Sequence, residues 1–101
     1  MMALTGDPIS ASRAYELGLV VSVHEPEELV AAARALAGKL AALSPFALAQ
    51  LKSSLTIAID AHMDSACQAE IKAFALCFST ADQEEGAKAF LEKRKPVFTG
   101  R

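Results

Sequence analysis

Apolar side chains recur at helical spacing over most of the chain after residue 25. From Pro26 to Leu43, leucines and alanines follow one another every three or four positions, which predicts an amphipathic helix over residues 26–43. Ser44–Pro45 provides the start signal for a second long helix. A break near Ala61–Met63 precedes a third long helix with its own apolar stripe.

The last predicted helix has a recognisable start and stop. Thr80, followed three residues later by Gln83, forms a capping box. The helix is expected to continue through Phe90 and Lys93, and Pro96 stops it.

The first 25 residues carry shorter signals. Leu4–Pro8 contains glycine and proline and predicts a turn. Ser10 is a good N-cap for a short helix, which Gly18 would end. The β-branched run Leu19–Val23 predicts one short strand, which would need a partner strand from elsewhere in the fold or from another protomer.

These patterns predict a mostly α-helical protein with four to five helices and at most one short strand. We divide it into residues 1–25, with the turn, short helix and short strand, and residues 26–101, a helical region. Apolar residues make up 52% of the 101 positions, and 21 of them are alanine. This composition excludes intrinsic disorder, but alanine contributes little burial energy, so we expect a thin core that depends on partners.

Charge and hydropathy narrow the class of protein further. The net charge of −2 argues against a nucleic-acid-binding protein. No apolar run reaches the length of a membrane span, and no secretory signal pattern is recognisable, so we expect a soluble protein of the cytoplasm or an organelle matrix, with no membrane partner.

Candidate metal-binding and catalytic groups are poorly arranged. Cys67 and Cys77 lie ten residues apart, which matches neither a redox motif nor zinc-ligand spacing. Asp60, His62 and Asp64 alternate, so in a helix the histidine would face away from both aspartates; they could converge only in a loop. We therefore predict no catalytic or metal-binding residue.

One local pattern suggests ligand binding. Phe90, Lys93 and Arg94 recur at i, i+3 and i+4, so a helix would place a ring beside two cations on one face. A phosphorylated adenine nucleotide needs such a stacking surface and such cations. The alternative is that the cations complement the helix dipole and belong to a solvated C-terminus of charge +4.

Two end motifs resemble one known family. The first is LTGD-x-I-x-A at Leu4–Ala11, followed by Ala14 and Gly18–Val20. The second is Glu85–Gly86 with AFLEKRKP-x-F at Ala89–Phe98. In this order and spacing they resemble the C-terminal segment of the enoyl-CoA hydratase/isomerase (crotonase) family. The spacing of the family is also matched between the two motifs, at Ser44–Pro45, Lys52 and Glu70.

The resemblance implies the helical C-terminal part of the crotonase (ClpP/crotonase-like) fold and an enzyme acting on acyl-CoA thioesters, by hydration of 2-enoyl-CoA. In this family the acid/base carboxylates and the oxyanion-hole amides precede the LTGD segment. None can be carried over to this chain, and we expect it to be catalytically silent by itself.

The resemblance also implies a ligand site and partners. Phe90 and Lys93 match the residues that the family brings to the adenine and phosphate end of coenzyme A, which arrives as part of the substrate rather than as a tightly bound cofactor. Residues 26–101 would then supply CoA and oligomer contacts, in a trimer or a dimer of trimers. The alternative is a non-enzymatic helical self-association module that docks on a full-length relative.

Overall fold

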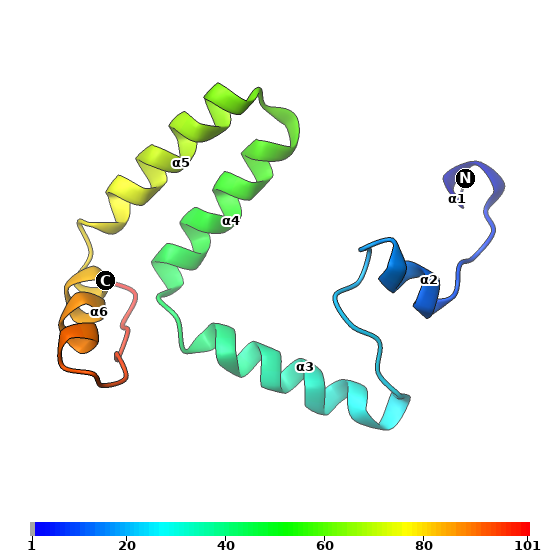
Figure 1. Cartoon of the computed structure of the whole chain (residues 1–101), viewed down its shortest axis with the longest axis horizontal. Helices are drawn as coiled ribbons and strands as arrows, with labels where there is room; N and C mark the ends of the chain where they lie inside the picture. Colours follow the sequence, from blue (N-terminus) through cyan, green and yellow to red (C-terminus); the bar gives the residue numbers. More distant parts are fainter. Residues whose placement is uncertain (1) are drawn as a thin grey trace. The chain divides into compact units, whose positions relative to one another are not determined.

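The computed structural model describes residues 2–101, and its regular structure is α-helical (Figure 1). In chain order the helices are α1 Met2–Thr5, α2 Ala11–Glu16, α3 Pro26–Ala41, α4 Pro45–Asp60, α5 Met63–Cys77 and α6 Ala81–Leu91. The chain forms two compact units, one ending at Leu36 and the other comprising Ala37–Arg101. The mostly helical fold class is confirmed, with the four-residue α1 added to the four to five helices expected. The turn predicted from Leu4 begins later, because Leu4 and Thr5 belong to α1.

The predicted strand at Leu19–Val23 is wrong, because the described residues form no β-strand. This segment is instead bent at Leu19–Val21 and irregular at Ser22 and Val23, with exposed side chains. A strand gains its hydrogen bonds from a neighbouring strand, and none is available within the described residues. β-branched composition alone therefore does not fix the extended pairing.

The ends of α2 form as the sequence predicts. The Ser10 hydroxyl oxygen accepts a hydrogen bond from the Arg13 N–H at 3.1 Å. At the other end, Gly18 adopts φ +72° and its N–H donates to the Tyr15 carbonyl, while the Leu19 N–H donates to Ala14. These two bonds define a Schellman motif, in which glycine avoids the strain of the left-handed conformation.

Helices α4 and α5 pack side by side as an antiparallel hairpin (Figure 1). Pro45 begins α4, and the Ser44 hydroxyl oxygen accepts a hydrogen bond from the Ala47 N–H. Extended backbone at Ala61 and His62 reverses the chain between the helices. The two helices of the hairpin form the two walls of a groove.

Helix α6 is packed against the C-terminal tail, which we define as residues 95–101. Thr80 is confirmed as its N-cap, since the Gln83 N–H donates to the Thr80 hydroxyl oxygen at 3.2 Å. The reciprocal half of the predicted capping box does not form, because the Thr80 N–H donates to the Cys77 carbonyl and not to the Gln83 side chain. Among the described residues, only Ala89 is a buried apolar side chain, and Asp82 is the only buried charged one. The core is therefore thin, and it lies between α6 and the tail.

The predicted continuation of α6 through Lys93 is wrong. The helix ends at Leu91, Glu92 is its C-cap, and Lys93 adopts φ 53°. The Lys93 N–H donates to the Phe90 carbonyl at 3.3 Å and the Arg94 N–H to the Ala89 carbonyl at 3.0 Å. This is a second Schellman motif, with lysine in the position that glycine usually occupies.

In residues 2–101, no single helix has both the length and the apolar composition needed to cross a membrane. Helices α3 and α4 pass that test only when they are counted together across the break between them.

Candidate functional site

Phe90 and Lys93 both lie at the C-terminal end of α6. Phe90 is 83% exposed, so its ring is available to a ligand. The backbone bond from Lys93 to Phe90 keeps the two residues adjacent. Within the described residues the Lys93 ammonium has no hydrogen bond or ion pair. This end of α6 thus carries an exposed aromatic ring and, three residues later, a positive charge that no described carboxylate pairs with.

Arg94 carries no such unpaired charge. Its Nη1 and Nη2 atoms donate to the Glu85 carboxylate at 2.6 and 2.9 Å, and its Nε donates to Glu92 at 2.6 Å. The prediction of two cations beside one ring on a continuous helix face is wrong, because the helix ends at Leu91 and both Lys93 and Arg94 lie beyond it. The guanidinium instead folds back onto the helix.

The ion pair shifts the pKa of both partners in the direction that favours their charged forms. The hydrogen bond from Arg94, supported by the Val97 N–H at 2.9 Å, lowers the pKa of Glu85 to about 2. The same hydrogen bond, with the one to Glu92, raises the pKa of Arg94 further above its usual value. Glu85 is therefore a fixed anion at neutral pH that joins Arg94 to the tail.

Asp82 holds the far end of the tail and was not anticipated as a structural residue. Its carboxylate accepts the Thr99 N–H at 2.7 Å and the Gly100 N–H at 3.0 Å, and its own N–H donates to the Arg101 carbonyl at 3.1 Å. Burial alone would raise the pKa of Asp82, but hydrogen bonds from Thr99, Ser44 and Gly100 hold it below the usual value. In the sequence, Asp82 is only an acidic residue in the first turn of a helix. The helix dipole favours acidic residues there, so its position gives no sign that it binds the tail.

The positions facing the tail follow one another on one face of α6. Asp82, Glu85, Gly86 and Ala89 stand at i, i+3, i+4 and i+7. At Gly86 an added β-carbon would lie 3.5 Å from the Phe98 ring, an ordinary van der Waals distance, so the ring packs over this position of the helix. The tail is thus fixed along the whole face that ends beside Lys93.

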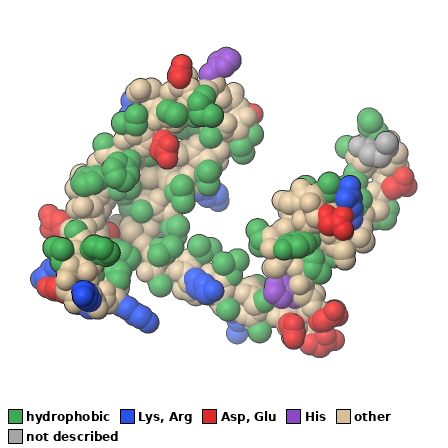
Figure 2. Space-filling view, viewed as in Figure 1, with side chains coloured by type: hydrophobic (Ala, Val, Ile, Leu, Met, Phe, Trp, Pro, Cys, Tyr) green, Lys and Arg blue, Asp and Glu red, His purple; other side chains and the backbone are tan. Residues whose placement is uncertain are grey.

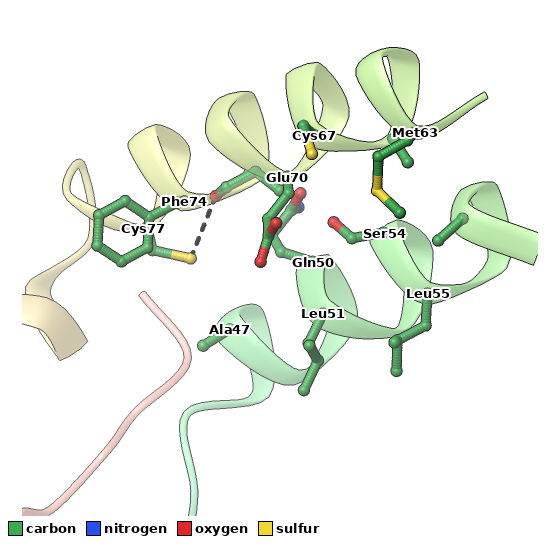
Figure 3. A pocket seen from close by; sticks show the side chains of 13 residues that line it. Ala47, Gln50, Leu51, Ser54, Leu55, Met63, Cys67, Glu70, Phe74 and Cys77 are labelled. Carbon is green, nitrogen blue, oxygen red and sulfur yellow. Dashed lines mark hydrogen bonds between the residues drawn. The ribbon is translucent and has the colours of Figure 1, made fainter. Parts of the chain in front are cut away.

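A second feature is the groove of about 430 Å³ between α4 and α5 (Figure 3). Gln50 and Ser54 from α4 and Glu70 from α5 bring polar groups into an otherwise apolar lining. The apolar lining residues are Ala47, Leu51, Leu55, Ala58, Met63, Ala66, Cys67, Ala73, Phe74 and Cys77. Figure 2 shows hydrophobic side chains gathered over these two helices.

The alternating acidic and histidine residues lie at the junction of α4 and α5. Asp60 ends α4, His62 is the N-cap residue of α5 and Asp64 lies in its first turn. Over residues 2–101 no three histidine, cysteine or acidic side chains come together as a metal site.

A family model described as enoyl-CoA hydratase/isomerase matches residues 1–101. The chain belongs to the enoyl-CoA hydratase/isomerase family. It is 40% identical over 94 residues to a crotonyl-CoA hydratase of Syntrophomonas wolfei, covering 93% of this chain and 36% of that protein. It is also 40% identical over 97 residues to a mitochondrial enoyl-CoA hydratase of Pongo abelii, covering 96% of this chain and 33% of that protein.

Solved structures of enoyl-CoA hydratases have the same fold over this segment. One from Geobacillus kaustophilus superposes with a TM-score of 0.91 at 44% identity, covering 96% of this chain and 38% of that one. One from Mycobacterium tuberculosis superposes with a TM-score of 0.89 at 40% identity, covering 98% and 39%. This enoyl-CoA hydratase/isomerase chain thus spans between a third and two fifths of the relatives' length, and the predicted helical crotonase segment is confirmed.

Proposed function

We propose that the chain is the C-terminal portion of an acyl-CoA-processing enzyme, an enoyl-CoA hydratase that adds water to 2-enoyl-CoA. Family membership supports the substrate class, and relatives named as enoyl-CoA hydratases support the reaction. In this proposal the chain contributes the nucleotide end of the CoA site and oligomer contacts. The carboxylates that move protons and the amides that stabilise the thioester oxygen belong to the part of the fold that the relatives have in addition.

The observation that carries the proposed ligand contact is that the exposed Phe90 ring and the unpaired Lys93 ammonium belong to residues joined by a backbone hydrogen bond at the end of α6. Adenine stacks on an aromatic ring, and phosphate oxygens accept strong hydrogen bonds from an ammonium group. Coenzyme A carries both groups at one end. It would arrive with the acyl substrate and leave with the product, without being a tightly bound cofactor.

We expect Lys93→Ala to weaken binding of coenzyme A by about tenfold, since a charge-assisted hydrogen bond to phosphate is lost. Isothermal titration of the chain with coenzyme A measures the change. Lys39→Ala is the matched control, because Lys39 is an exposed lysine in the last turn of α3. Equal affinities of wild type and Lys93→Ala would remove Lys93 from the proposed site.

A second candidate function is helical self-association, supported by the exposed apolar side chains of α4 and α5. Soluble monomers rarely expose large contiguous apolar surfaces. Light scattering of the chain should then give a mass above 10.6 kDa that rises with concentration. Leu55→Glu, in the groove, should restore the monomer mass, whereas Leu91→Glu, exposed on α6, should not. A wild-type monomer at high concentration would contradict this function.

A further inference from the structure

Lys93 occupies a backbone conformation that needs support. Among the described residues it is the only one other than glycine with positive φ. L-residues with a β-carbon are disfavoured there, so the surrounding contacts must hold the conformation in place. At the equivalent position of α2 the chain uses Gly18, which needs no such support.

The contacts that hold Lys93 come from its two neighbours. Glu92 precedes it, Arg94 follows it, and the two side chains are joined by a bond of 2.6 Å from Arg94 Nε to Glu92 Oε2. This link closes a ring around the Lys93 backbone. Arg94 then attaches the ring to α6 through both oxygens of Glu85.

Arg94 has little capacity left for a ligand. A guanidinium has five N–H groups. Three of them bind the carboxylates of Glu85 and Glu92, and a fourth donates to the Lys95 carbonyl at 3.2 Å. Two carboxylates also neutralise its charge. An effect of Arg94 on phosphate binding must therefore act through the residue that it holds.

We propose that Arg94 is a positioning residue: by linking Glu92 to Glu85, it fixes the left-handed backbone of Lys93, the residue whose ammonium is proposed to bind the phosphate end of coenzyme A. The effect of Arg94 on ligand binding rests on the proposed function. Its effect on the Lys93 backbone rests only on the hydrogen bonds of Arg94 with Glu85 and Glu92.

A double-mutant cycle with coenzyme A tests the ligand part. We expect Arg94→Ala to weaken binding by about tenfold, and Lys93→Ala/Arg94→Ala to bind no more weakly than Lys93→Ala. Arg13→Ala is the control, because it removes an exposed arginine paired with Glu16 on α2, and it should leave the affinity unchanged. Multiplied losses in the double variant would show direct contact by Arg94 and overturn the proposal, as would full affinity in Arg94→Ala.

Nuclear magnetic resonance tests the backbone part without a ligand. The nuclear Overhauser effect between the amide and α protons of Lys93, with its α-carbon shift, reports φ, because the two protons lie closer together at positive φ than at negative φ. We expect both to move toward averaged values in Arg94→Ala. Glu92→Gln should shift both signals in the same direction. Because this change replaces only an exposed carboxylate, it provides the test if Arg94→Ala does not fold.

These two measurements separate the possible failures. If wild type does not bind coenzyme A but the Lys93 signals change in the variants, the proposed function fails and the backbone role of Arg94 stands. If the Lys93 signals in Glu92→Gln and in folded Arg94→Ala equal those of wild type, the positioning role is wrong whatever the affinity.

Discussion

Asp82→Ala is expected to release the end of the tail from α6. The Thr99 and Gly100 N–H groups both donate to the Asp82 carboxylate, which is 3% exposed. Hydrogen bonds to a buried carboxylate are strong, and alanine provides no replacement acceptor. Amide hydrogen exchange at Thr99 and Gly100 should accelerate by at least about tenfold, measured residue by residue at neutral pH.

Asp64→Ala is the matched control for this change. Asp64 is the second residue of α5, as Asp82 is the second residue of α6, but it is exposed and has no contact with the tail. Loss of a favourable charge near the helix dipole is therefore common to both variants. Equal exchange at Thr99 and Gly100 in wild type and Asp82→Ala would mean that this carboxylate does not hold the tail.

The features that could be predicted from sequence depend on neighbouring residues. Ser10 and Thr80 cap helices through bonds to residues three positions later, so the signal is local. Gly18 ends α2 because glycine adopts the left-handed conformation readily. The same rule misses the end of α6, since lysine at position 93 gives no such signal.

The features that could not be predicted depend on distant contacts. Arg94 reaches Glu85 nine positions away only because the chain reverses after α6. Spacing on an ideal helix therefore placed Arg94 beside Phe90, where it does not lie. Likewise the run at Leu19–Val23 has strand composition, but extended pairing requires a partner strand that local sequence does not specify.

Ala89→Leu is expected to cost the most stability of any apolar change. Ala89 is 0% exposed and shares the tail-facing side of α6 with Gly86, against which the Phe98 ring packs. Three added carbon atoms have no free space there, so they must displace the tail or distort the helix. We expect the free energy of unfolding to fall by about 1–3 kcal/mol, measured by urea denaturation followed by circular dichroism.

Ala87→Leu separates overpacking from an effect of leucine on the helix. Ala87 is exposed on the same helix, and leucine is nearly as good a helix former as alanine, so stability should change by less than about 0.5 kcal/mol. A loss confined to Ala89→Leu would place the stabilising contact between α6 and the tail. Equal stabilities of the two variants would mean that the tail does not pack on α6 at Ala89.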